Sequence, residues 1–65
     1  MCLAFPGKIL KIDKDTALVD FDGIQKEANI SLVKIKTGDY VIVHAGFAIQ
    51  KLTKEDAFAA LKMYE

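Results

Sequence analysis

Residues 16–30 read TALVDFDGIQKEANI, and this stretch decides the fold. Asp22-Gly23 stands at its centre, and a type I′ hairpin turn needs positive φ at both central residues, which Asp-Gly adopts at low cost. Apolar and polar residues alternate on both sides of the turn, with Lys26 interrupting the second apolar face. The stretch therefore predicts a β-hairpin with strands at 16–21 and 24–30. Its predicted apolar face comprises Ala17, Val19, Phe21, Ile24, Ala28 and Ile30.

Further strands are predicted on both sides of this hairpin. Residues 7–13 precede it and end at a charged turn, with Leu10 and Ile12 expected on one face of the strand. Residues 40–43 are almost wholly apolar and β-branched, as in a central strand. Gly46 then marks a bend, a bulge or a close backbone approach before a fifth strand begins at Phe47.

The chain changes to helix at Thr53, which suits the N-cap, with Asp56 three residues on and Lys62 near the other end. Phe58, Leu61 and Tyr64 are expected to share an apolar stripe. Five short strands and one helix predict a mainly β fold, a small five-stranded OB-like antiparallel barrel with a C-terminal α-helix. The whole chain, 1–65, is expected to form one domain, with the barrel at about 7–51 and the helix at about 53–64.

Composition limits the classes of function. The chain has 65 residues, 52% of them hydrophobic, and nine basic residues balance nine acidic ones. Nucleic-acid binders usually carry surplus positive charge, so we expect no nucleic-acid partner. The apolar runs are too short to span a bilayer, and the N-terminus lacks the basic region of a secretory signal. We expect a cytoplasmic protein without a membrane partner.

Cys2 is the only cysteine, so an internal disulfide is impossible. A lone cysteine is usually a buried apolar side chain, but a residue at a chain end rarely lies deep in a core. Removal of Met1 would leave an α-ammonium on Cys2, and a nearby positive charge favours the thiolate, a soft ligand for iron, copper or zinc. We therefore expect Cys2 to be an accessible metal ligand.

His44 is the only histidine and ends an apolar predicted strand. At a barrel rim it could simply form hydrogen bonds, or it could ligate a metal, shuttle protons or orient a thiolate. Cys2 and His44 together offer two side-chain ligands, fewer than the four of a closed structural zinc site. Any metal held here is expected to be shared, ligated exogenously or passed on.

The three residues after Cys2 are more apolar than a free tail normally is. They are expected either to pack on the barrel or to form a docking strip, because contiguous exposed apolar surface marks interaction sites. In the second case Pro6 would be a stiff elbow and Gly7 a flexible residue between strip and barrel. The predicted partner-binding residues are Cys2, Leu3, Ala4, Phe5 and Pro6.

Two stretches resemble the signatures of the HypC/HupF family of [NiFe]-hydrogenase maturation chaperones. They are MCLAFPGK at residues 1–8 and GDYVIVHAGFAI at residues 38–49. The first is specific because it is fixed at the terminus, whereas Gly-Asp at the start of the second occurs in many small barrels. Phe5 departs from the pattern, where an aliphatic residue is more usual, and so does Ala45, where a larger aliphatic residue often appears.

The resemblance implies an OB-like barrel with a C-terminal helix, acting as a non-enzymatic metallochaperone. Its cargo would be iron, held transiently as Fe(CN)2CO and shared with a partner. The implied partners are a HypD-type iron-sulfur maturation protein, the [NiFe]-hydrogenase large-subunit precursor and a HypE-type cyanide-donating protein. By position, Cys2 matches the family's essential thiol, and His44 matches a histidine that either ligates iron or supports Cys2.

Two other functions fit parts of the sequence. Five short strands and the Gly-Asp-Tyr turn also suit a small OB-like module that binds nucleic acid or the ribosome, although the lysines are spread among acidic residues. A thiol enzyme built on Cys2 and His44 is disfavoured, because nothing evident orients the histidine and the chain is too short for a deep pocket.

Overall fold

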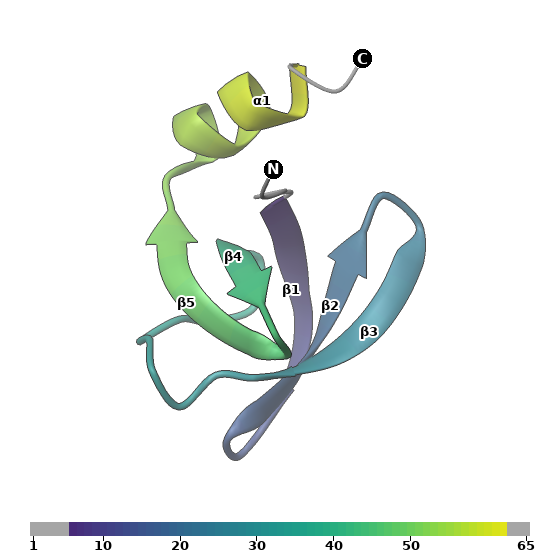
Figure 1. The fold of residues 1–65 in the computed structure, drawn as a ribbon, viewed down its shortest axis with the longest axis vertical. Coiled ribbons are helices and arrows are strands. Elements are labelled where there is room, and N and C mark those ends of the chain that lie inside the picture. Colours follow the sequence, from purple (N-terminus) through teal and green to yellow (C-terminus); the bar gives the residue numbers. More distant parts are fainter. Residues whose placement is uncertain (1–5, 63–65) are drawn as a thin grey trace.

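The computed structural model describes residues 6–62, which form a five-stranded closed barrel followed by one helix (Figure 1). The strands neighbour one another in the order β1-β2-β3-β5-β4, and β4 returns to β1. The mainly β barrel with a C-terminal helix is therefore confirmed. The elements are β1 (Pro6–Asp13), β2 (Thr16–Phe21), β3 (Ile24–Asn29), β4 (Tyr40–His44), β5 (Phe47–Leu52) and α1 (Lys54–Lys62).

The β2–β3 hairpin forms as its sequence predicts. Asp22 and Gly23 have φ angles of 54° and 95°, the positive values of a type I′ turn. The Gly23 N–H also donates a hydrogen bond of 3.1 Å to the Asp20 carboxylate, which stabilises the turn. From the turn, the antiparallel ladder continues without a break to the pair formed by Thr16 and Asn29.

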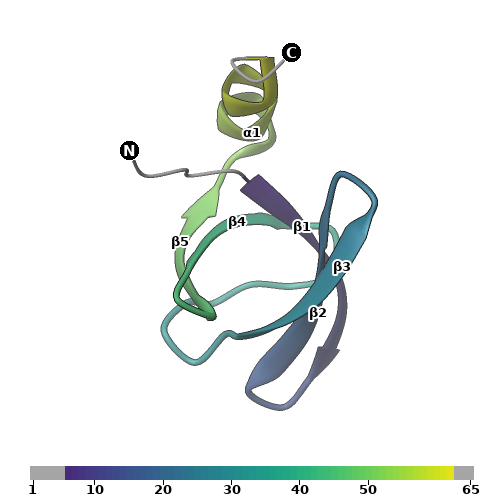
Figure 2. The ribbon, with the colours of Figure 1, turned by 45° about the vertical axis from the view of Figure 1, so that its right-hand side comes forward.

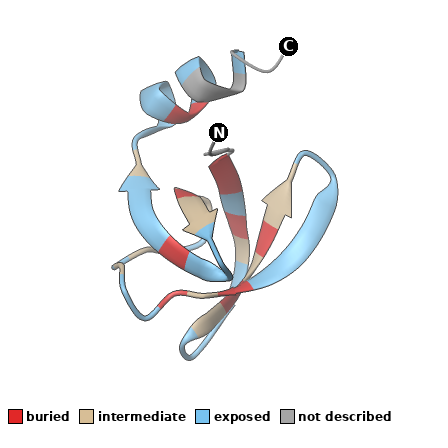
Figure 3. Cartoon of the chain, viewed as in Figure 1, coloured by how far each residue is buried: buried red, intermediate tan, exposed pale blue. Residues whose placement is uncertain are grey.

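The core lies inside the barrel, where small and β-branched side chains meet from every strand (Figure 3). Ile24 is an exception, because it is 62% exposed, and the prediction that it joins the apolar face of the core is wrong. Ile24 is the first residue of β3, and the turn end of the β2–β3 hairpin stands away from the other strands of the barrel (Figures 1 and 2). The buried core residues of the barrel are Ile9, Ala17, Val19, Ala28, Ile30, Val41 and Ala48.

A bulge interrupts β1. The register of β1 against β2 shifts by one residue between Ile9 and Lys11, which leaves Leu10 without an opposite residue. Beyond the bulge, Ile12 lies opposite the core residue Ala17. The regular alternation predicted for residues 7–13 is therefore interrupted, because the extra residue puts Ile12 on the same face as the core residue Ile9.

The barrel closes through a parallel pair, whereas the prediction was an antiparallel barrel. Asn29 of β3 pairs in parallel with Phe47 of β5, and the Asn29 N–H donates a hydrogen bond of 2.8 Å to the Gly46 carbonyl. The other strand pairs are antiparallel. The connection between β3 and β4 crosses the barrel and packs Val33 and Ile35 against the core, so that β5 arrives running in the same direction as β3.

Helix α1 begins at the predicted N-cap, since the Asp56 N–H donates a hydrogen bond of 3.0 Å to Thr53 Oγ1. The helix contacts β1 and β5 and buries Ala57 completely. Phe58 is 57% exposed and meets Tyr40 edge to face, with the ring centroids 6.4 Å apart. Of the predicted stripe, the Leu61 side chain and Tyr64 lie outside the described part of the chain.

Within residues 6–62 no helix has the length and apolar character needed to cross a membrane.

Gly7 is part of the barrel wall. It is buried within β1 and pairs with Val41 of β4, as the predicted strand at 7–13 requires, and it is not the flexible link that the docking-strip alternative expected. A Cβ atom built on Gly7 would collide with Val19 Cγ1 and would lie 2.6 Å from Phe21 Cε1. The absence of a side chain therefore allows β1 to approach the side chains of β2 closely.

Gly7→Ala is predicted to lower the free energy of unfolding by about 1–3 kcal/mol, because the added methyl group overpacks the space beside Val19 and Phe21. Urea unfolding followed by circular dichroism measures the change. Lys8→Ala, at the next and exposed position of β1, is the control and should change stability by less than about 0.5 kcal/mol. Equal stability of the two variants would contradict the close approach at Gly7.

Candidate functional site

Two of the predicted site residues, Pro6 and His44, lie in the described part of the chain. Pro6 is buried at the start of β1, and His44 is exposed at the end of β4. The other four predicted residues lie outside residues 6–62, so their proposed roles in metal binding and docking stay predictions. These four are Cys2, Leu3, Ala4 and Phe5.

A tight turn positions His44. Ala45 and Gly46 follow it with φ angles of 54° and 83°, and His44 pairs with Phe47 across the turn. This is the geometry of a two-residue type I′ hairpin, which is the form taken by the bend expected at Gly46. Because Val41 and Val43 pack on the core, strand alternation directs His44 to the outer side of the barrel. The imidazole is therefore accessible to a ligand.

The turn also accounts for the small residue at position 45. A β-branched side chain is strongly disfavoured at positive φ, whereas alanine is accommodated at a smaller cost. Ala45 departs from the resembled motif at a position with positive φ, where alanine is less strained than a branched aliphatic residue. The substitution is therefore compatible with the hairpin that carries His44.

Pro6 and His44 lie near the same end of the β1–β4 ladder. Pro6 is opposite Ile42, and His44 is two residues further along β4, on the side away from the rest of β1. Two strand residues span about 7 Å and adjacent strands lie about 5 Å apart, so the two Cα atoms are roughly 8 Å apart. Cys2 precedes Pro6 by four residues, which reach at most about 14 Å. Chain length therefore allows Cys2 and His44 to bind one metal ion.

Apolar side chains are exposed next to His44. Phe47, its cross-strand neighbour, is 42% exposed, and Ile49 on the same strand is 49% exposed. Between them Ala48 is fully buried. Sequence reasoning missed this surface, although a small residue between two large apolar ones is a signal that the large ones face outward when the barrel interior is narrow.

No group of three or more histidine, cysteine or carboxylate side chains that could hold a metal ion occurs within residues 6–62. His44 by itself is one ligand, so a stable closed site would need further donors.

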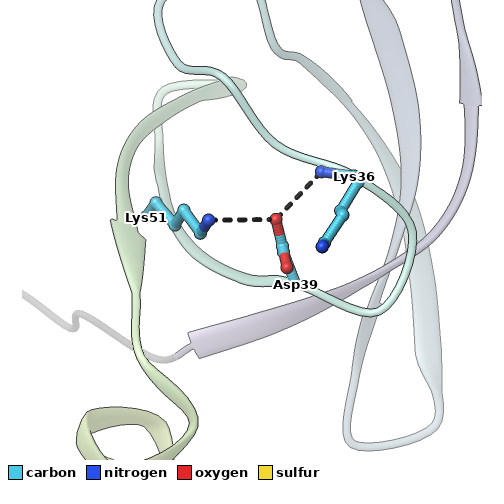
Figure 4. Close-up of polar contacts among 3 residues, drawn as sticks. All are labelled: Lys36, Asp39 and Lys51. Atoms are coloured by element: carbon cyan, nitrogen blue, oxygen red, sulfur yellow. Dashed lines mark hydrogen bonds and ion pairs between the residues drawn. The ribbon is translucent and has the colours of Figure 1, made fainter.

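The motif at residues 38–49, which carries His44, begins with a hydrogen-bonded turn centred on Asp39 (Figure 4). Its carboxylate accepts a hydrogen bond of 2.9 Å from the Lys36 backbone N–H and lies 3.5 Å from Lys51 Nζ. The Lys36 N–H bond, and then the positive charges of Lys51 and Lys36, hold the pKa of Asp39 below its ordinary value, although burial opposes this. Gly38 and Asp39 also exchange two backbone hydrogen bonds of 2.8 Å with Ile9. The Gly-Asp pair therefore anchors the start of β4 to β1.

The sequence model of the HupF/HypC family matches residues 1–64. The chain belongs to the HupF/HypC family. Curated relatives include proteins called hydrogenase maturation factor HypC. That of Helicobacter hepaticus is 38% identical over 68 residues, covering 100% of this chain and 79% of its own. That of Azotobacter chroococcum is 42% identical over 65 residues, covering 97% and 77%. The Escherichia coli K12 protein is 36% identical and covers 88% and 71%.

Asp39→Ala in this HupF/HypC protein is predicted to lower the free energy of unfolding by about 1–2 kcal/mol at pH 7, because it removes a charge-assisted hydrogen bond. The folded pKa of Asp39 lies below the ordinary value of 3.8. The Asp39 carboxylate therefore contributes its full stabilisation when the pH is above the unfolded-state pKa. This stabilisation is lost as the pH falls through the lower, folded-state pKa. Urea unfolding across a pH series should show the difference between wild type and variant shrinking at acidic pH.

Lys51→Ala is the matched control for Asp39→Ala. It keeps the Lys36 N–H bond and removes only an ion pair whose lysine is half-exposed, so it should cost less than about 0.5 kcal/mol. A difference between wild type and Asp39→Ala that stays constant from neutral to acidic pH would show that the carboxylate charge does not stabilise the turn.

Proposed function

We propose that this protein is a hydrogenase maturation chaperone that helps a HypD-type iron-sulfur protein to assemble the Fe(CN)2CO group and delivers this group to the [NiFe]-hydrogenase large-subunit precursor. Membership of the HupF/HypC family and the names of the relatives support a role in hydrogenase maturation. The observation that carries the proposal is the position of His44, exposed at the end of the ladder at which Pro6 enters the barrel.

In this proposal the iron group is cargo, and Cys2 and His44 hold it only in part. The Cys2 thiolate is a soft donor suited to iron, and His44 adds an imidazole or supports the thiolate. Two protein donors leave the remaining coordination positions to cyanide, carbon monoxide and the partner. Such incomplete coordination favours transfer over storage, because a partner's ligands can replace those of the chaperone one at a time.

Partner docking would use apolar surface on both sides of His44. The exposed Phe47 and Ile49 on β5 supply one part of this surface, and the predicted docking residues Cys2, Leu3, Ala4 and Phe5 are proposed to supply the rest. A partner that covers these side chains also removes water from the iron group during transfer. The proposal includes no catalytic turnover, and it places the protein in the cytoplasm, where Cys2 stays reduced.

The proposed role is tested by producing the protein anaerobically with its HypD-type partner and recording infrared spectra of the purified complex. The wild-type complex should show cyanide and carbonyl stretching bands. Cys2→Ala should lose these bands, because the thiolate ligand is removed. His44→Ala should keep the complex and shift the band positions, because the imidazole alters electron density at the iron directly or through Cys2.

Gln50→Ala is the matched control, since Gln50 is a polar, exposed residue on the same hairpin as His44. It should leave both the complex and the bands unchanged. A Cys2→Ala variant that retained the complex and all the bands would show that the thiol does not hold the iron group.

A further inference from the structure

Positive charge gathers on a surface formed by the connection between β3 and β4 together with β5. Lys34 and Lys36 from the connection and Lys51 from β5 line a shallow hollow of about 280 Å³ with Ile35 and Asp39. Three of the nine basic side chains of a chain with zero net charge thus share one hollow with a single carboxylate. The hollow therefore has a net charge of +2, and the rest of the chain, with six basic and eight acidic side chains, has a net charge of −2.

The backbone of this hollow is fixed. Ile35 is partly buried against the core, so its exposed neighbours Lys34 and Lys36 lie on the outer side of the connection. The Asp39 carboxylate holds the turn from inside through the Lys36 N–H, and the Asp39 N–H donates a hydrogen bond of 3.0 Å to the Lys36 carbonyl. Figure 4 shows the side chains of Lys36 and Lys51 on opposite sides of this carboxylate. The turn therefore places Lys36 and Lys51 beside the same carboxylate.

Asp39 neutralises part of this charge. Its Oδ2 atom lies 3.5 Å from Lys51 Nζ and accepts the hydrogen bond from the Lys36 backbone N–H. Lys34 has no ion pair within residues 6–62, and neither does Lys36. Their two ammonium groups are available to an external anionic group.

We propose that this hollow, which we call the lysine hollow (Lys34, Lys36 and Lys51), receives an acidic segment of the protein partner, and the inference rests on the proposed function. Lysine is a compact, hydrated charge without the planar fork of arginine, and single exposed ion pairs contribute little affinity. A free anion would therefore be held weakly in so open a hollow. A cluster of such charges is effective for a different task, which is to accelerate and orient the encounter with a larger molecule of opposite charge.

The experiment measures association with the HypD-type partner by stopped-flow fluorescence at low and at high ionic strength. Lys34→Glu/Lys36→Glu should slow association roughly tenfold at low salt and have little effect at high salt, because steering is screened beyond about 10 Å at 0.1 M salt. Lys34→Gln/Lys36→Gln, which adds no repulsion beside Asp39, should slow it severalfold. Circular dichroism checks that both variants fold.

Lys11→Glu/Lys26→Glu is the matched control, because it changes the net charge equally at two exposed lysines outside the hollow. It should slow association less than about twofold. Equal slowing by the two Glu pairs would overturn the inference, since net charge alone would then govern the encounter. Saturable binding of inorganic phosphate to the isolated protein at micromolar concentration, abolished by Lys34→Gln/Lys36→Gln, would overturn it as well, by showing a site for a free anion. Failure of the wild-type protein to associate at all would instead overturn the proposed function.

Discussion

The structure depends on β1 pairing with two strands at once. Lys8 of this strand lies opposite Asp20 of β2 on one side and Tyr40 of β4 on the other. This double pairing joins the β2–β3 and β4–β5 hairpins into one sheet, which the β3–β5 pair then closes into a barrel, and it leaves β1 without a free edge. The missing side chain at Gly7 and the extra residue at Leu10 both follow from it, because a strand that bridges two sides of a small barrel must come near the β2 side chains and then bend.

The same closure explains which parts of the fold the sequence could predict. The β2–β3 hairpin and the helix N-cap depend on signals within a few residues, Asp22-Gly23 and Thr53, and both are confirmed. The parallel contact of Asn29 with Phe47 depends on where the β3–β4 connection crosses the barrel, which no local pattern encodes. The exposure of Ile24 is also not encoded locally. Alternation predicts which residues of a strand share a face, but it does not predict how much of that face the rest of the barrel covers.

In the candidate site too, the sequence predicts the features that depend on neighbouring residues and does not predict those that depend on how distant segments pack. The end of a strand at His44 and a special backbone at Gly46 were readable from residue types, and the structure refines them to a type I′ turn with an outward-facing imidazole. The lysine hollow was not readable, since Lys34, Lys36 and Lys51 are brought together only when the β3–β4 connection lies beside β5. The exposure of Phe47 and Ile49 is not predictable from the strand that begins at Phe47, because hydrophobic residues in a short strand indicate burial unless the interior is already full.

A core this small limits how a chaperone can be built. The barrel encloses only small and medium-sized side chains, and a chain of 65 residues buries a modest share of its surface, so its stability margin is narrow. Phe47 and Ile49 stay about half exposed, which forgoes roughly half of the about 1.5–3 kcal/mol that complete burial of such a side chain contributes. In the proposed function a partner recovers part of this free energy by covering them, which couples docking to the site of metal transfer. In the same proposal the Asp39 turn has two effects, since it anchors the start of β4, the strand that ends at His44, and also positions Lys36 of the lysine hollow.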